Sequence, residues 1–184
     1  MNVRGNIHFK SLNESYFDLM LRWFNKPHVQ AFYSLRTWTY EEVCKKLEPN
    51  MRGEKQISSF IIYQDNHPIG YIQSYPVKEH PWENQDLSEE ITQKAAGFDL
   101  FIGEEAYLNQ GLGKQILECF LEEHIWPDYQ YCIVDPDIRN EASKRLFQKC
   151  GFIEHKQIDT QNALKQPMTL QLLIRKREKF SVPP

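Results

Sequence analysis

Two neighbouring features of this sequence could support chemistry, and both lie between Ala95 and His124. The first is Asp99, which stands in the middle of the apolar run Ala95–Ile102. That run has the length and composition of a β-strand. An unpaired carboxylate in such a strand is costly, and burial raises its pKa toward neutrality. Asp99 is therefore a candidate proton acceptor, unless an Arg or Lys from elsewhere in the chain pairs with it.

The second feature is the turn Gly111-Leu112-Gly113, which falls where the strand pattern changes to a helix pattern. The free N–H groups at a helix start lie at the positive end of the helix dipole and bind phosphate oxygens. Glycine, which has no Cβ, lets a pyrophosphate approach the backbone. Alone, the turn is more often a simple strand-to-helix connection. The apolar face of the helix is formed by Leu112, Ile116, Leu117, Phe120 and Leu121.

Composition limits the class of protein. The 184 residues are 41% hydrophobic and 13% aromatic, which predicts one globular domain over 1–184 with a flexible tail at 176–184. No apolar run approaches the roughly 18 residues of a membrane span, and the N-terminus lacks a signal-peptide core. We therefore expect a cytoplasmic protein without a membrane partner. The net charge of −3 argues against nucleic acid as a partner.

The cysteines give no support to metal or thiol chemistry. They are widely spaced, and none stands in a C-x-x-C pair or near a histidine at ligand spacing. Small apolar core residues are the expected role for Cys119 and Cys150. We therefore expect no metal site.

The sequence before Ala95 predicts one strand and two helices in its first part. A strand is expected over 6–12, a helix over 17–24, and a second helix after the capping-box residues Thr39 and Glu42. Between the helices the sequence is crowded with aromatic rings. These form either an aromatic core or an apolar wall for a substrate, and the sequence favours neither. The residues are His28, Phe32, Tyr33 and Trp38.

A β-hairpin follows, with strands over 57–63 and 69–75. Alternation places Tyr71, Gln73 and Tyr75 on one face of its second strand. The stretch 76–92 then reads as a long irregular insertion, with five acidic residues against a single lysine. Such a run is usually a solvated loop. Because it precedes the strand of Asp99 and contains Trp82, it is also placed to cover a site for a polycationic, ring-shaped substrate.

The last part of the chain completes the sheet. A strand over 129–134 ends at Asp135-Pro136-Asp137, which aims carboxylates off the end of the strand, although Asp-Pro is also common turn chemistry. A helix begins near Asn140 and is closed by Gly151. Strands over 152–156 and 168–175 are expected as an antiparallel pair with a flexible connection.

These stretches resemble the GNAT acetyltransferases, and among them the aminoglycoside 6′-N-acetyltransferases. The resemblance spans about residues 20–152, and its more specific parts are Ile69–Tyr75, read as IGYIQSY, and the aspartate of Gly97-Phe98-Asp99. It also includes Trp82-Glu83, Gly111-Leu112-Gly113, Asp135-Pro136 and the stretch from Asn140 to Phe152. The family implies an α/β fold with a central mixed β-sheet of about six to seven strands, flanked by helices.

The resemblance also implies roles for particular residues. Asp99 matches the general base of the family, and acetyl-CoA is the implied co-substrate. Residues that match or adjoin the aminoglycoside cleft are Asp135, Gln73, Tyr75, Trp82 and Glu83. Residues that match the cofactor site are Gln110, Gly111, Leu112, Gly113, Lys114 and, near the pantetheine arm, Asn140.

Two departures from the family pattern bear on the cofactor and the leaving group. Leu108 and Asn109 occupy the first positions of the usual R/Q-x-x-G-x-G turn. Phe147 stands where the family has a tyrosine that protonates the departing CoA thiolate. Phenylalanine has no proton to give. Either another group does this, or none is needed, because a thiol pKa of about 8.5 makes the thiolate a tolerable leaving group.

The resulting hypothesis is direct attack by a substrate amine on the acetyl thioester, with Asp99 as the base that removes the ammonium proton. The implied acceptor is the 6′-amine of an aminoglycoside. Two alternatives stay open. One is acetyl transfer to another amine, such as a siderophore precursor, a polyamine or a protein N-terminus. The other is a non-catalytic module that keeps the CoA fold, an idea that Phe147 favours and Asp99 opposes.

Overall fold

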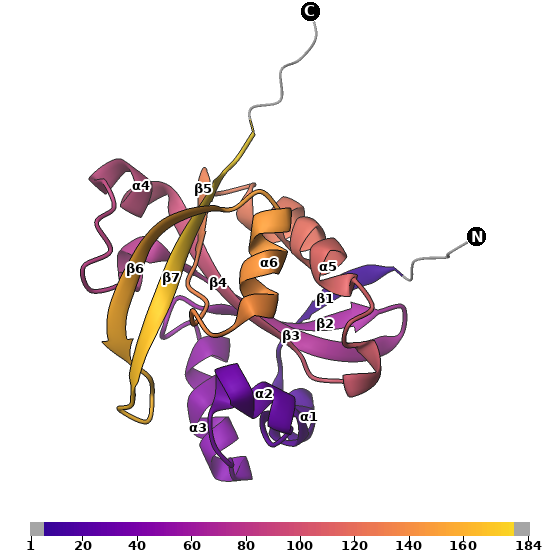
Figure 1. Ribbon diagram of the computed structural model, residues 1–184. Helices are drawn as coiled ribbons and strands as arrows, with labels where there is room; N and C mark the ends of the chain where they lie inside the picture. Colours follow the sequence, from indigo (N-terminus) through magenta and orange to yellow (C-terminus); the bar gives the residue numbers. More distant parts are fainter. Residues whose placement is uncertain (1–5, 179–184) are drawn as a thin grey trace, which may run out of the picture.

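The structure, a computed structural model, describes residues 6–178 and has a mixed seven-stranded sheet at its centre (Figure 1). The strands lie in the order β1-β2-β3-β4-β5-β7-β6. Only β4 and β5 are parallel neighbours. Their bounds are β1 Ile7–Ser11, β2 Ser58–Gln64, β3 His67–Pro76, β4 Ala95–Ile102, β5 Tyr131–Val134, β6 Ile153–Gln161 and β7 Pro167–Lys176. The predicted α/β class with a central mixed sheet is confirmed.

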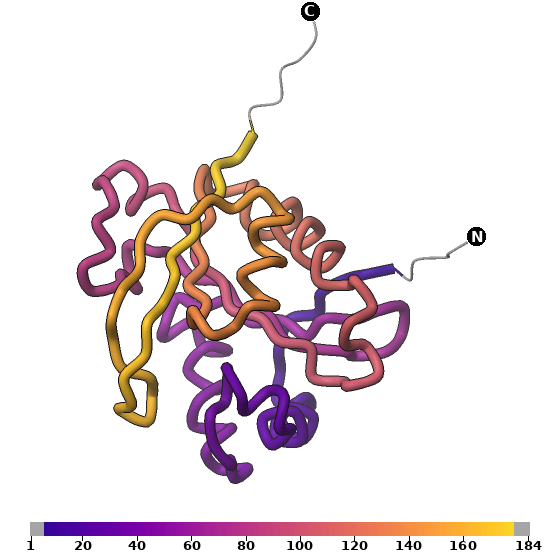
Figure 2. The backbone as a smooth tube through the Cα atoms, viewed as in Figure 1, coloured from indigo at the N-terminus to yellow at the C-terminus, as the bar shows by residue number. Residues whose placement is uncertain are grey.

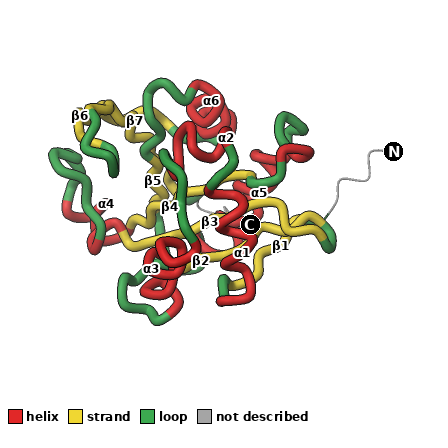
Figure 3. Tube along the Cα trace, turned by 90° about the horizontal axis from the view of Figure 1, so that it is seen from below, coloured by secondary structure: helices red, strands yellow, loops and turns green. Residues whose placement is uncertain are grey.

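Helices cover both faces of this sheet, as the view in Figure 3 also shows for α1, α2 and α3. The α-helices are α1 Phe17–Phe24, α2 Pro27–Val29, α3 Tyr40–Met51, α4 Glu89–Lys94, α5 Leu112–Phe120 and α6 Glu141–Lys149. None of the helices within residues 6–178 combines the length and apolar character that a membrane crossing requires.

Alternation along the central strands divides the core into two layers. Ile62, Ile72 and Phe98 pack against α5 and α6. Their neighbours in sequence point to the opposite face, where Tyr71 and Phe101 pack against α1 and α3. Asp99 therefore shares its face with the N-terminal helices, as the alternation predicts.

The N-terminal segment forms most of that second layer. The capping box is present, because Thr39 accepts a bond from the Glu42 backbone while the Glu42 side chain accepts one from the Thr39 N–H. The crowded aromatic segment contributes mainly to the core: Tyr33 packs on Phe101 with ring centroids 4.7 Å apart. Phe32, by contrast, is 45% exposed.

The stretch 76–92 is more ordered than the sequence predicts. It contains a 3₁₀ turn at Val77–Glu79, and α4 begins inside it because Ser88 caps the helix by accepting a bond from the Ile91 N–H, 3.3 Å away. Trp82, Leu87 and Ile91 pack against a small apolar cluster made of Val77, Ala95, Ile133, Ile158 and Leu172. The segment lies beside β6, as Figure 2 shows. We call residues 76–92 the acidic insertion.

The C-terminal hairpin also differs from the expectation. β6 continues to Gln161, and the connection to β7 is a tight turn rather than a flexible one. The side-chain oxygen of Asn162 closes it by accepting bonds from the backbone N–H groups of Leu164 and Gln166. Of the tail predicted over 176–184, Lys176 is the last residue of β7, and positions 179–184 lie outside the described residues.

The sheet opens between β4 and β5. Their pairing covers only Ala95–Gly97 against Tyr131–Ile133, whereas β3 accompanies β4 along its whole length. Beyond Gly97, β4 has a partner on one side only within the described residues. Asp99 lies just past this divergence, and Asp135 follows the end of β5.

The contact between α5 and α6 provides a test of the fold. A Cβ on Gly113 would lie 2.9 Å from Cδ2 of Leu146, so we expect the cost of displacing Leu146 to outweigh the helix-propensity gain of roughly 1 kcal/mol, and Gly113→Ala to reduce the free energy of unfolding by about 1 kcal/mol. In urea unfolding, the double variant Gly113→Ala/Leu146→Ala should lose less than the two single losses added together. Additive losses would mean that the two positions do not crowd each other.

Candidate active site

Asp99 is held between polar and aromatic groups of β3. Its Oδ2 accepts a hydrogen bond of 2.8 Å from Nε2 of Gln73, the residue directly opposite in the β3–β4 ladder. The Oε1 of Gln73 accepts a 2.9 Å bond from the Tyr71 hydroxyl. The sequence predicted that Tyr71 and Gln73 share a face, and the structure brings both to Asp99.

The cost of burying the negative charge of Asp99 is only partly offset by its neighbours. Burial raises its pKa, and the Gln73 hydrogen bond and then the charge of Lys46 oppose that rise. Among the described residues, no Arg or Lys lies within ion-pair distance of Asp99, so the alternative of a salt-bridged structural carboxylate does not hold. A raised pKa makes the Asp99 carboxylate a stronger proton acceptor than an exposed aspartate.

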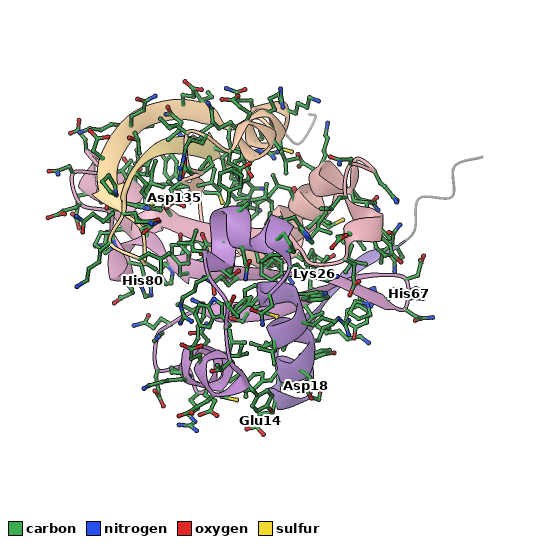
Figure 4. All side chains as sticks on the ribbon, turned by 60° about the horizontal axis from the view of Figure 1, so that its bottom comes forward. Glu14, Asp18, Lys26, His67, His80 and Asp135 are labelled. Atoms are coloured by element: carbon green, nitrogen blue, oxygen red, sulfur yellow. The ribbon has the colours of Figure 1, made fainter. Side chains whose placement is uncertain are left out.

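Asp135 is a second carboxylate close to the first. Nε1 of Trp82 donates a 2.8 Å hydrogen bond to its Oδ2. Burial, and then the charge of Asp99, raise the pKa of Asp135 to about 7, while the Trp82 bond opposes the shift. The predicted pair of Trp82 and Asp135 is therefore in direct contact, and it ties the acidic insertion to the end of β5. Figure 4 labels Asp135 on the same side of the molecule as His80.

Tyr75 forms an aromatic wall next to these carboxylates. Its ring lies 5.4 Å from His80 and 6.5 Å from Trp82, measured between centroids. A Cβ on Gly97 would come within 2.4 Å of Cε2 of Tyr75, so glycine is needed there for the ring to lie flat over β4. Burial, followed by the charges of Asp99 and Asp135, raises the pKa of the Tyr75 hydroxyl well above its usual value. That hydroxyl is therefore neutral at pH 7 and can donate a hydrogen bond.

The acidic insertion is partly neutralised by its own neighbours. Asp86 lies 3.7 Å from Nζ of Lys156, and Glu90 lies 3.2 Å from Nζ of Lys94. Glu79 and Glu83 are exposed. Glu79, Glu83 and Glu89 are thus the acidic residues of the insertion for which no ion pair is found among the described residues.

The two glycines of the turn Gly111-Leu112-Gly113 have different surroundings. Gly111 caps α5 in the left-handed conformation, with φ of 74°, and a Cβ there would meet nothing within 4 Å. The start of α5 is thus open at Gly111, where no side chain caps the helix. Gly113 faces Leu146 instead, so its missing Cβ serves helix packing rather than access to the backbone.

The other predicted cofactor residues surround this turn. The Gln110 amide donates a hydrogen bond to the carbonyl oxygen of Ala106. Leu112 is buried, and Lys114 is exposed in the first turn of α5. Asn140 caps α6 by accepting a 3.2 Å bond from the Ser143 N–H, which is a structural use of its side chain.

Phe147 is a core residue. It is 7% exposed, and its ring centroid lies 5.9 Å from that of Phe98 and 5.6 Å from that of Phe152. The hydrophobic environment explains why a phenylalanine is stable at this position.

Lys46 was missing from the predicted site, and Tyr33 was predicted only as part of an aromatic segment that could form either core or a substrate wall. The charges of Tyr33 and Asp99 influence each other, and so do those of Lys46 and Asp99. Lys46 lies one residue before buried Leu47 on α3. The sequence carries no signal for either contact, because α3 and the segment before it reach Asp99 only through the tertiary fold.

The raised pKa of Asp135 predicts a pH dependence of stability. Its folded pKa of about 7 exceeds the value of about 3.9 for unfolded Asp, so between these values the folded state binds more protons. The free energy of unfolding therefore loses a contribution as pH rises from about 4 to about 7. Asp135→Asn should remove this loss. The free energy of unfolding of the variant, minus that of the wild type, should therefore be larger at pH 8 than at pH 4 by on the order of 1–3 kcal/mol.

The measurement is urea unfolding at both pH values, with Asp128→Asn, an exposed aspartate on a turn, as the matched control. Equal pH slopes in the wild type and in both variants would contradict the shifted titration of Asp135.

Comparison with known proteins identifies the family of this chain. Residues 13–160 match the family described as acetyltransferase (GNAT) domain. The aminoglycoside N(6′)-acetyltransferase type 1 of Klebsiella pneumoniae is 22% identical over 157 residues, which are 82% of this chain and 76% of that protein.

Solved structures share the fold. A protein of Bacillus halodurans has a TM-score of 0.81 at 24% identity, covering 95% of this chain and 86% of its own. The aminoglycoside acetyltransferase AAC(6′)-Ib, solved with coenzyme A and kanamycin, has a TM-score of 0.74 at 19% identity, covering 94% and 95%. With most of its length matched by the family, this chain belongs to the GNAT acetyltransferases.

Proposed function

We propose that this acetyltransferase transfers the acetyl group of acetyl-CoA to a primary amine of a polycationic small molecule, and that the 6′-amine of an aminoglycoside is the acceptor. The observation that carries the proposal is the pair of buried carboxylates, Asp99 and Asp135, which have no ion-pair partner among the described residues and lie beside the aromatic wall of Tyr75 and Trp82. Buried carboxylates without a cationic partner favour a ligand that brings positive charge.

In this proposal Asp99 is the general base. An amine is protonated at pH 7, so a proton must leave before the nitrogen can attack the thioester carbon. Asp99 accepts that proton, directly or through a water, and the neutral amine then attacks the thioester carbon to form a tetrahedral intermediate. Its collapse breaks the carbon–sulfur bond and expels the CoA thiolate, which takes up the second proton that the nitrogen loses as the amide forms. A backbone N–H of β4, next to the divergence from β5, would stabilise the developing oxyanion.

Asp135, Gln73, Tyr75, Trp82 and Glu83 hold the acceptor. Asp135 binds an ammonium group, and the rings of Tyr75 and Trp82 contact the sugar faces. A bound ammonium group favours the charged carboxylate, so substrate binding lowers the pKa of Asp135. The relatives named as aminoglycoside acetyltransferases, and the neighbour solved with kanamycin, support this class of acceptor.

Acetyl-CoA lies with its pyrophosphate at the start of α5, in the proposal, where Gly111 leaves the backbone open. The residues around it are Gln110, Gly111, Leu112, Gly113, Lys114 and Asn140. Phe147 cannot protonate the leaving thiolate, because its ring is buried and has no acidic proton. When bound, acetyl-CoA supplies the activated acetyl group.

Asp99→Asn tests the base directly. The variant keeps the shape of the side chain and removes its basicity, so kcat should fall by about 10² to 10⁴. The melting temperature should hold or rise, because a costly buried charge is gone. Asp128→Asn is the control and should keep both values. An Asp99→Asn enzyme with near wild-type kcat would exclude Asp99 as the base, and loss of activity together with the fold would mark it as structural.

Charge on the acidic insertion should act through binding. Changing Glu79 and Glu83 to Gln should raise KM for a polycationic acceptor by about threefold to tenfold with little change in kcat, which is the pattern of lost uniform binding. The effect should shrink at high salt, since exposed charges are screened beyond about 10 Å at 0.1 M. Glu122→Gln and Glu123→Gln, exposed near the end of α5, are matched controls. A KM that responds to neither mutation nor salt would identify the insertion as ordinary solvated surface.

A further inference from the structure

A continuous chain of hydrogen bonds connects the last turn of α3 to Asp99. Nδ2 of Asn50 on α3 lies 3.3 Å from Oγ of Ser59 on β2, and Ser59 Oγ lies 2.8 Å from the Tyr71 hydroxyl on β3. The Tyr71 hydroxyl donates to Gln73, which donates to Asp99. Three elements thus connect through side chains to one carboxylate.

Every donor in this chain points toward Asp99. The carboxylate can only accept, so Gln73 must present Nε2 to it and Oε1 to Tyr71. The Tyr71 hydroxyl donates its one hydrogen to Oε1 of Gln73, so it can only accept from the Ser59 hydroxyl. Ser59 Oγ in turn accepts from the Asn50 amide. Aligned hydrogen bonds polarise one another, so the whole chain favours a negative charge at its end.

The chain is not explained by stability. Tyr71 is fully buried in an aromatic layer, where a phenylalanine would pack without a hydroxyl to satisfy. At the other end, Oδ1 of Asn50 is buried and has no hydrogen-bond partner among the described residues. An unsatisfied buried acceptor typically costs about 1–3 kcal/mol. A polar chain kept at this cost between apolar layers suggests a role at the group where it ends.

We propose that Tyr71, itself oriented by Ser59 and Asn50, is a positioning residue that fixes the Gln73 amide so that it holds Asp99 ionised and aimed into the acceptor site. The proposal rests on the function proposed above for Asp99. Without the Tyr71 hydroxyl, the Gln73 amide loses the contact that orients it and donates less well to the carboxylate. Asp99 then takes up a proton at higher pH and is less available as a base.

Other charged and titratable groups also influence Asp99 and stay in place in the test. They are Lys46 on α3, Tyr33 before it, Tyr75 on β3 and Asp135 after β5. None of them belongs to the hydrogen-bonded chain, so a change confined to Tyr71 leaves their charges unaltered.

The test is Tyr71→Phe with Tyr63→Phe as the matched control. Tyr63 is also nearly buried and its hydroxyl lies 3.1 Å from that of Tyr16, but it is outside the chain to Asp99. The carboxyl titration of Asp99 is followed by NMR in protein labelled with carbon-13 at aspartate, with Asp99→Asn to assign the signal. The acid limb of kcat/KM is recorded on the same preparations.

We expect the Asp99 midpoint to rise in Tyr71→Phe and, by a smaller amount, in Ser59→Ala, and to stay unchanged in Tyr63→Phe. At one pH unit below the wild-type midpoint, kcat/KM of Tyr71→Phe should fall about threefold to tenfold, and on the alkaline plateau it should stay within about twofold. Ser59→Ala carries the test if Tyr71→Phe does not fold.

An unchanged Asp99 midpoint in Tyr71→Phe and Ser59→Ala would overturn the proposal, whatever the activity. A midpoint that rises while Asp99→Asn stays fully active would support the chain and refute the base role of Asp99. The NMR readout therefore separates failure of this inference from failure of the proposed function.

Discussion

Keeping a carboxylate charged inside a sheet of aromatic side chains is the constraint on which the rest of this structure depends. Water would stabilise the charge of Asp99 far better than Phe101 and Tyr33 do. The structure offers it one strong hydrogen bond, from Gln73, and a lysine beyond ion-pair distance. These contacts offset only part of the hydration that the Asp99 carboxylate loses on burial. The site therefore favours binding of a cation, and the carboxylate is a stronger base than that of an exposed aspartate.

The divergence of β4 from β5 gives that carboxylate access to reactants. Pairing with β5 stops at Gly97, so the β5-side edge of β4 is unpaired at Asp99 within the described residues. α5 follows β4 in the chain and packs on the face of the sheet opposite to the one that Asp99 shares with α1 and α3. The proposed acetyl donor and acceptor thus approach from opposite sides of one strand.

Local patterns predicted the elements well, because each is set by nearby residues. The strand of Asp99 begins and ends where its apolar run does, and the helix after Thr39 starts at its capping box. The errors fell where a weak local signal was supported by distant contacts. The α4 turn packs on β5–β7, and the polar end of β6 is held by pairing with β7.

The site divides in the same way. The face shared by Tyr71 and Gln73 follows from a period of two, and the position of Asp99 from its apolar flanks. The contacts of Ser59, Asn50, Lys46 and Tyr33 depend on how separate elements pack, so no spacing in the sequence reveals them. For Gly113 the sequence predicted that the missing Cβ admits a pyrophosphate, whereas in the structure the Leu146 side chain occupies that space.

The acceptor class is the central claim, and a panel of amines with acetyl-CoA tests it most directly. Thiol release is followed with kanamycin-type aminoglycosides, polyamines, lysine derivatives and a peptide with a free N-terminus, under one set of conditions. The account predicts that kcat/KM for the aminoglycosides exceeds that for every other amine by at least about tenfold, and that the product carries the acetyl group on the 6′-nitrogen. Faster turnover of a polyamine or a lysine derivative, with the aminoglycosides inert, would contradict it.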